Sequence, residues 1–216
     1  MEAFGVRSEV LDRAALAAME PHLTGDLVGG VHWRDPYSLA EPLALSLAYE
    51  KLFEAQGGRF LQGDARSLRQ EPDGWSVETN DGRISARDCL VTLGPWAIDV
   101  TGPLGYRMPL GVKRGYHMHY RPKGNAMLNL PVLDGDTGYL LAPMTHGIRL
   151  TTGAEFADRD APPNYTQLER AEPIARTYFP LAERVDPQPW LGRRPCTPDM
   201  VPVMGPAPRH KGLWFS

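Results

Sequence analysis

The sequence predicts an α+β protein in which strands dominate the middle of the chain and helices lie before and after them. Residues 111–153 carry strand patterns joined by short turn signals, and apolar residues recur at helical spacing over residues 39–56. Helices do not alternate with strands along the chain. A complete doubly wound βαβ domain is therefore not expected.

Two helices are expected in the first part of the chain. Residues 8–19 have an amphipathic pattern that starts at a capping residue, Ser8, and stops before Pro21. A longer helix is expected over residues 39–56, closed by the diglycine 57–58. Its apolar residues share one face: Leu39, Leu43 and Leu47.

After residue 58 the pattern changes to that of short strands. Turn signals predict one hairpin at Asn80-Asp81-Gly82 and another across His146-Gly147. The strands are expected over residues 59–64, 74–79, 83–86, 88–94, 111–120, 138–144 and 147–153, and a further apolar strand over 212–216.

The last third of the chain holds one further helix and a proline-rich stretch. The helix is expected to begin at Thr166, which has capping-box spacing with Glu169, and to end near Pro180. Residues 190–209 contain five prolines, so they are too interrupted for a central strand. A stiff loop is expected there.

The composition is that of an ordinary soluble globular protein. Of 216 residues, 42% are hydrophobic and 23% are charged, and the net charge of −3 gives no reason to expect a nucleic-acid surface. Cys89 and Cys196 lie far apart, so neither a disulfide framework nor a zinc site is expected. No apolar run reaches the ~20 residues of a transmembrane helix and no signal pattern is present, which favours a cytoplasmic location.

The histidines of the central strand pattern offer one candidate metal site. His117 and His119 are two residues apart, so both side chains are expected on one face of a strand. An H-x-H metal site would need a third ligand that the sequence does not identify. Strand histidines that face solvent or form hydrogen bonds are the alternative interpretation.

The arginine doublet of the proline-rich stretch is the strongest candidate for binding. The guanidinium group of Arg193 or Arg194 could pair with Asp199 or with carbonyl groups of its own loop. The functional alternative is bidentate capture of a substrate carboxylate, for which a rigidly held guanidinium is suited. No nucleophile elbow or phosphate-binding glycine motif occurs in the sequence, so hydrolase chemistry is not supported.

Four segments resemble FAD-dependent amino-acid and amine oxidoreductases of the D-amino-acid dehydrogenase, D-amino-acid oxidase and glycine oxidase type. The most specific is WLGRRPCTPDMVPVMGP at residues 190–206. The others are CLVTLGPW at 89–96, PLGVKRGYH at 109–117 and GGRFLQGDARSL at 57–68. The resemblance covers most of the chain and matches the interior-to-C-terminal part of this family.

The resemblance implies a partial two-domain flavoprotein. An antiparallel-sheet substrate domain would comprise residues 1–34 and 103–187. An incomplete FAD-binding α/β domain would comprise residues 35–102 and 188–216. The family's opening G-x-G-x-x-G is missing from this sequence, so this chain alone is expected to hold FAD weakly or not at all and to be inactive.

The resemblance also assigns roles to particular residues. It makes Arg194 the carboxylate-binding arginine, leaves Arg193 to structure, and places Tyr116 and His117 on the substrate side. No catalytic side chain is required, because the flavin takes a hydride from the substrate. The cofactor-binding residues that it implies are Ala65, Thr92, Leu93, Gly94 and Gly205.

The implied function is oxidation of the C–N bond of an amino acid, with a D-amino acid favoured. The expected partner is this small substrate, with no nucleic acid and no transmembrane segment. Apolar edges of the incomplete domain are expected to favour self-association. The full-length protein is expected in the cytoplasm or at the periphery of the inner membrane. A non-catalytic domain that binds a small acid or a partner surface is the alternative.

Overall fold

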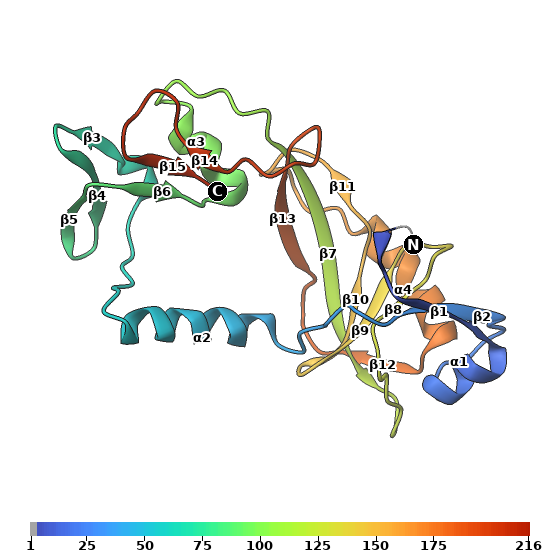
Figure 1. Ribbon diagram of the computed structural model, residues 1–216. Coiled ribbons are helices and arrows are strands. Elements are labelled where there is room, and N and C mark those ends of the chain that lie inside the picture. The colour runs from blue at the N-terminus through green and yellow to red at the C-terminus, as the bar shows by residue number, and fades with distance from the viewer. Residues whose placement is uncertain (1–3) are drawn as a thin grey trace. The chain divides into compact units, whose positions relative to one another are not determined.

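The computed structural model describes residues 4–216, and its elements can be followed in Figure 1. Its mixed helix and strand content confirms the predicted α+β class. The helices are α1 (Arg13–Met19), α2 (Pro42–Ala55), α3 (Ala97–Thr101) and α4 (Thr166–Tyr178), with short 3-10 turns at η2 (Ala65–Ser67) and η3 (Gly94–Trp96). Within the described residues, no helix is long and apolar enough to cross a membrane.

The strands fall into several sheets. The strands are β1 (Ser8–Asp12), β2 (Gly29–Trp33), β3 (Arg69–Glu71), β4 (Gly74–Thr79), β5 (Gly82–Ala86), β6 (Cys89–Val91), β7 (Gly111–Pro122), β8 (Val132–Leu133), β9 (Leu140–Met144), β10 (Gly147–Thr151), β11 (Glu155–Phe156), β12 (Leu181–Arg184), β13 (Trp190–Cys196), β14 (Gly205–Pro206) and β15 (Leu213–Phe215).

The largest sheet has seven strands in the order β11-β7-β10-β9-β8, and β12 and β13 also pair with β7. The neighbours β7, β10, β9 and β8 pair antiparallel, as predicted for the middle of the chain. Because side chains alternate along a strand, Met118 and Tyr120 enter the core while His117 and His119 lie on the opposite face.

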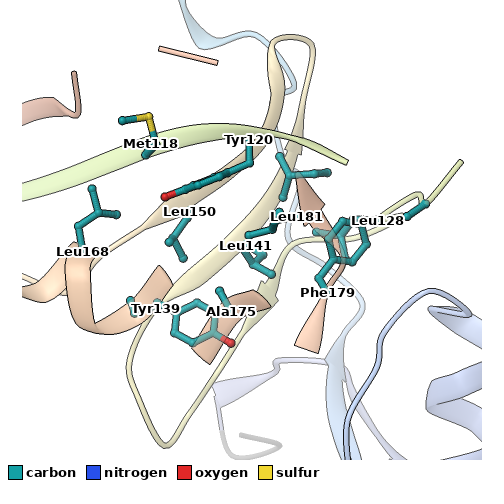
Figure 2. Close-up of a cluster of buried hydrophobic side chains, with 13 residues drawn as sticks. Met118, Tyr120, Leu128, Tyr139, Leu141, Leu150, Leu168, Ala175, Phe179 and Leu181 are labelled. Atoms are coloured by element: carbon teal, nitrogen blue, oxygen red, sulfur yellow. The ribbon is translucent and has the colours of Figure 1, made fainter. Parts of the chain in front are cut away.

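One hydrophobic core joins this sheet to α4 (Figure 2). Apolar side chains of β7, β9 and β10 meet the inward face of α4, which begins after Asn164 and contains Pro173. Met118, Tyr120, Leu150, Ala175 and Phe179 are fully buried there. The helix tolerates an internal proline because its packing outweighs the lost hydrogen bond.

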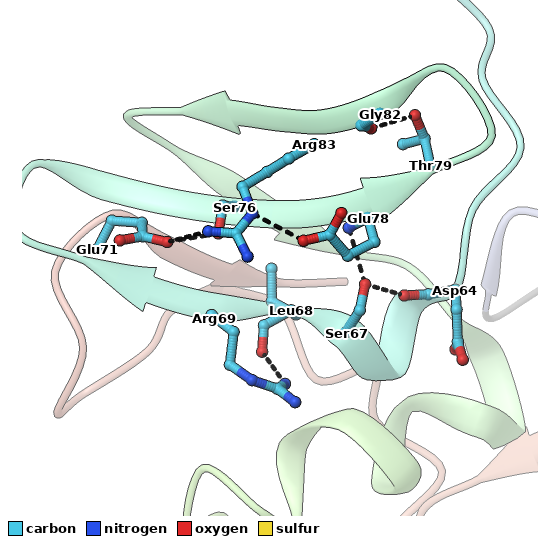
Figure 3. A network of polar contacts seen from close by, with 10 residues as sticks. All are labelled: Asp64, Ser67, Leu68, Arg69, Glu71, Ser76, Glu78, Thr79, Gly82 and Arg83. Carbon is cyan, nitrogen blue, oxygen red and sulfur yellow. Dashed lines mark hydrogen bonds and ion pairs between the residues drawn. The ribbon is translucent and has the colours of Figure 1, made fainter.

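A second sheet, β3-β4-β5, forms a local antiparallel unit. Thr79 pairs with Gly82, so Asn80 and Asp81 form the predicted two-residue turn, and Gly82 adopts φ +100°. Figure 3 shows the polar contacts that support it, including Arg83 Nε donating to Glu78 at 2.7 Å.

The predicted tail strand also forms. β15 pairs in parallel with β6, which precedes it by more than a hundred residues, and antiparallel with β14. Val91, Leu213 and Phe215 are buried in a second apolar cluster. Their neighbours Leu90 and Trp214, paired on the other face of the same two strands, are 58% and 42% exposed.

The chain divides into two compact units, each made of separated segments. The first unit contains the described residues up to Ser46 together with Gly115–Glu155 and Pro162–Gly192. The second unit contains Leu47–Arg114, Phe156–Ala161 and Arg193–Ser216.

The prediction of one helix over residues 8–19 is wrong in its first half. The chain forms β1 there, paired with β2 in the register Val10↔Val31, before α1 begins. The cap is Asp12, whose carboxylate accepts the Ala15 amide at 2.8 Å, rather than Ser8. A sheet partner about twenty residues away outweighs the local helical pattern.

Two further local predictions need correction. Residues 59–64 form no named strand and contribute one isolated bridge, Gly63↔Thr79. At the start of α4 the capping box does not form, since Tyr165 is the N-cap residue and makes no side-chain cap. Asn164 Oδ1 accepts the Thr166 amide at 3.1 Å instead.

The prediction of a stiff loop over residues 190–209 is also partly wrong, because residues 190–196 form strand β13. Its one strand partner among the described residues is β7. An edge strand can hold Pro195 without breaking a ladder hydrogen bond on its unpaired side. Arg193 and Arg194 therefore lie on a strand, and only residues 197–204 connect it to β14 as a loop.

Candidate functional site

A pocket of about 260 Å³ lies in the second unit. It forms where the end of β6, the turn η3, the end of β13 and the following loop meet β15. Its lining is largely apolar: Val91, Gly94, Ala97, Met108, Leu110, Pro195, Cys196, Thr197, Met200, Val201, Pro202, Val203, Phe215 and Ser216. Two segments that resemble the flavoprotein family, residues 89–96 and 190–206, both contribute to it.

Gly94 is the position where the pocket requires glycine. Its φ of +54° lies in the left-handed region that other residues rarely adopt. A Cβ placed on Gly94 would lie 3.9 Å from Pro195 Cδ. This distance is an ordinary contact, so it is the backbone turn at η3, and not a lack of space, that favours glycine here.

The arginine doublet is divided by the alternation of β13, which sends the two side chains to opposite faces of the strand. Arg193 is half-buried, and its Nε donates to the Arg159 carbonyl at 2.7 Å. Arg159 Nη1 in turn donates to Asp99 at 2.9 Å and to the Pro95 carbonyl at 3.3 Å. These contacts connect β13 to the turn and helix that line the pocket.

Arg194 is exposed and makes no hydrogen bond or ion pair with any residue of the range 4–216. The local alternative, an ion pair with Asp199, is not formed. The Asp199 carboxylate instead accepts the Val201 amide at 3.1 Å, and this contact holds the pKa of Asp199 below its usual value. Arg194 precedes the pocket-lining Pro195 in the sequence, and its guanidinium has no partner among the described residues.

The other proposed cofactor contacts lie at several places in the second unit. Ala65 begins the turn η2, and Thr92 and Leu93 connect β6 to Gly94, but none of these three lines the pocket. Gly205 begins β14 opposite the pocket-lining Phe215, and a Cβ there would meet nothing within 4 Å.

The two proposed substrate contacts on β7 lie on opposite faces of the strand. Tyr116 is 1% exposed, and its hydroxyl donates to Glu155 Oε2 at 2.7 Å and accepts the Asn164 amide at 2.9 Å. His117 stacks on Trp190, with ring centroids 4.7 Å apart. The strand therefore does not bring Tyr116 and His117 to one surface.

His117 titrates in an unusual environment. Burial lowers its pKa to about 4, and the charge of Arg149 and the nearby His119 add to this effect. The imidazole is therefore neutral at physiological pH.

Sequence reasoning missed a polar cluster on the His117 face of the sheet. Asp186 bonds to His119 Nδ1 at 2.8 Å and to His146 Nε2 at 3.2 Å, and Arg149 Nε lies 3.0 Å from His119 Nε2. The predicted hairpin across His146-Gly147 was the available signal, because Arg149 pairs with His119 once that hairpin joins β7.

Comparison with known proteins shows the family of this chain. Residues 1–216 match the DAO family, described as FAD dependent oxidoreductase. The chain is 28% identical over 219 residues to a D-amino acid dehydrogenase of Paramagnetospirillum magneticum, covering 98% of this chain and 51% of that protein. It is 26% identical over 141 residues to a glycine oxidase of Pseudomonas putida, covering 65% of this chain and 38% of that protein.

Solved structures share the fold. Glycine oxidase from Geobacillus kaustophilus superposes with a TM-score of 0.79 at 21% identity, over 99% of this chain and 58% of that one. L-proline dehydrogenase from P. horikoshii gives a TM-score of 0.77 at 17% identity, over 99% of this chain and 59% of that one. The chain spans about half the length of the D-amino acid dehydrogenases it matches. It belongs to the DAO family of FAD-dependent oxidoreductases.

Proposed function

We propose that this chain is part of an FAD-dependent oxidoreductase that oxidises the C–N bond of an amino acid, with a D-amino acid as the favoured substrate. Membership of the family supports the redox chemistry. Similarity to D-amino acid dehydrogenases from several bacteria supports the substrate class. The observation that carries the proposal is the unpaired guanidinium of Arg194, next to a residue of an apolar pocket.

Arg194 is the residue we propose for binding the substrate carboxylate. A guanidinium group presents parallel N–H donors that match the two oxygens of a carboxylate. Strand β13 and the contacts of Arg193 fix the backbone from which Arg194 projects. A fixed backbone lowers the entropy lost when substrate is oriented.

The pocket is chemically suited to one end of the cofactor. Its apolar lining fits a flat aromatic ring system, and of the two such rings in FAD, the flavin and the adenine, we propose the flavin. The pyrophosphate of FAD would need a phosphate-binding turn, and the sequence holds no G-x-G-x-x-G. We propose residues 35–102 and 188–216 for the flavin side, to which the pocket-lining Met108 and Leu110 also contribute, and the rest of residues 1–34 and 103–187 for the substrate side.

Bound FAD would supply the hydride acceptor for oxidation of the substrate carbon. What this chain supplies is orientation and exclusion of water. Among the described residues that line the pocket there is no Asp, Glu or His. The apolar wall strengthens polar interactions at its rim by keeping the local dielectric constant low, and Arg194 orients the substrate through its carboxylate.

Flavin reduction tests this proposal directly. The full-length protein that contains this chain is purified, supplied with FAD, and titrated anaerobically with D-alanine, L-alanine, glycine and sarcosine. We expect flavin absorbance that bleaches most readily with the D-amino acid. Failure to take up FAD, or a flavin that stays oxidised with all four compounds, would overturn the proposal; bleaching by another compound would correct the substrate class.

Substitution of Arg194 tests the carboxylate contact. We expect Arg194→Lys to weaken substrate binding by about 30-fold, since losing a charge-assisted bidentate contact costs on the order of 2 kcal/mol. The flavin spectrum should not change. Arg170→Lys is the matched control, because Arg170 is an exposed arginine on α4 with no bonded partner within residues 4–216. Equal effects of the two substitutions would exclude the assigned role.

A further inference from the structure

The polar cluster on the sheet contains a carboxylate shared by two histidines. His119 projects from β7 and is 6% exposed, while His146 lies in the turn between β9 and β10. Asp186 follows β12 and places one oxygen 2.8 Å from His119 Nδ1 and the other 3.2 Å from His146 Nε2. Burial raises the pKa of Asp186, but the bonds to His119 and His146 outweigh it and hold this pKa below its usual value.

The contact with Arg149 fixes the tautomer of His119. A guanidinium group can only donate hydrogen bonds, and Arg149 Nε lies 3.0 Å from His119 Nε2. His119 Nε2 must therefore carry the lone pair, and its proton resides on Nδ1, where it is donated to Asp186. The result is a directed series of bonds from Arg149 through neutral His119 to an ionised carboxylate.

This arrangement argues against a metal site. The ligand atoms of His119, His146 and Asp186 lie within 4.8 Å of one another, close enough to suggest one. A metal would need the Nδ1 lone pair of His119, with the proton moved to Nε2. That proton would then face the N–H of Arg149, and the positive charge of Arg149 would oppose a cation.

The outer end of Arg149 has no hydrogen-bond or ion-pair partner in the part of the chain that the structure describes. Only Nε forms a hydrogen bond, and the two terminal nitrogens make none with any residue between 4 and 216. The side chain is half-buried, and burial lowers the pKa of Arg149. Glu41 and Asp186 influence it electrostatically, but neither forms an ion pair with it. A partly desolvated guanidinium with its donor pair unused is poorly stabilised by the protein alone.

We propose that Arg149 binds the carboxylate group of a small-molecule ligand through its two terminal nitrogens, with His119 and Asp186 as positioning residues. The bond to His119 holds the guanidinium plane in one orientation, which prepares the bidentate geometry that a carboxylate requires. All these residues belong to the first unit. The inference therefore does not depend on the roles proposed for Arg194 or for the pocket.

NMR of the full chain labelled with ¹⁵N-arginine tests this site, with acetate as the probe and chloride replacing it at constant ionic strength. We expect a protected Arg149 Nε–H signal before titration and saturable shifts of its terminal nitrogens with acetate. Arg170→Met should leave this titration unchanged, and Arg149→Met should abolish it. An absent shift, or one that chloride reproduces, would overturn the proposal.

Asp186→Asn tests the positioning role separately. The amide of the introduced side chain can donate to His119 Nδ1. The histidine proton then lies on Nε2, where it repels the N–H of Arg149. We expect ¹⁵N-histidine shifts to report the other tautomer and acetate affinity to fall about tenfold or more, with the circular dichroism spectrum unchanged. Unchanged affinity in a folded variant would overturn the positioning role. Stoichiometric zinc binding that shifts the His119 signals would show the cluster to be a metal site instead.

Discussion

The two faces of the sheet around β7 and β10 are built from neighbouring residues but have opposite characters. Leu150 is fully buried in the core with α4, while the adjacent Arg149 is half-buried among histidines and an aspartate. Met118 and His119 form the same contrast on β7. One strand therefore contributes side chains to the core and to a polar cluster, and their alternation places the two on opposite faces.

Helix α2 differs from both faces of the sheet, because its apolar side chains are not buried against other residues. It contains no buried residue, and Leu43, Leu52 and Phe53 are 65%, 51% and 54% exposed. Helix α4 buries Leu168, Ala171 and Ala175 instead. Helix α2 is the more apolar of the two and helix α4 the more strongly amphipathic, so apolar content alone does not decide which helix is buried; a packing partner does.

The largest expected effect comes from the core face. Leu150→Ala should lower the free energy of unfolding by about 3 kcal/mol, through lost apolar burial and a residual cavity. Arg149→Met, one residue away, keeps the aliphatic stem and should cost about 1 kcal/mol or less. Urea denaturation followed by circular dichroism measures both. Similar losses for the two variants would refute the division between the faces.

A smaller effect is expected at the rim of the core, where Glu172 of α4 contacts Arg176 at 2.8 Å and also pairs with Arg184. Burial raises the pKa of Glu172, but Arg184 and Arg176 outweigh it and hold this pKa below the ordinary 4.5. The ionised form therefore stabilises the fold above pH 4.5, and the contribution is lost as the pH falls through the lower folded-state pKa.

Glu172→Gln should accordingly cost about 1–2 kcal/mol at pH 7. The difference from the wild-type chain should shrink in measurements below pH 4.5. A difference that stays constant across this range would show that the substitution acts through packing rather than charge.

The exposed apolar residues of α2 should affect association more than stability. Replacing Leu43 and Leu52 by Ser should change the free energy of unfolding by less than about 0.5 kcal/mol per site. We expect the wild-type chain to self-associate and the double variant to do so less, as measured by light scattering across a concentration series. A wild-type chain that stays monomeric throughout would contradict this expectation.

A pH-dependent effect on stability is expected at His117, on the polar face. An NMR titration should give it a midpoint near the pKa of about 4 rather than 6.5. Since the folded state prefers the neutral ring, its stability should decline as the pH falls from 6.5 toward 4. Arg149→Met should raise the midpoint, because the charge of Arg149 opposes protonation; an unchanged midpoint would exclude that influence.

The sequence by itself determined the elements whose signals are local. The hairpin at residues 80–82, the strand pattern of β7, the hairpin between β9 and β10, and the glycine that closes α2 all follow from turn chemistry and side-chain periodicity. The family resemblance likewise selected Gly94, which lines the pocket, while Arg194 and Gly205, chosen from residues 190–206, do not line it.

Only the tertiary structure decided the features that depend on distant partners. Residues 8–12 became a strand because β2 pairs with them, and residues 190–196 became a strand because β7 does. Arg149 and Asp186 reach His119 from 30 and 67 residues away. Periodicity gives the direction of a side chain, but the partner that it meets is fixed by long-range packing, whose free energy outweighs local preference.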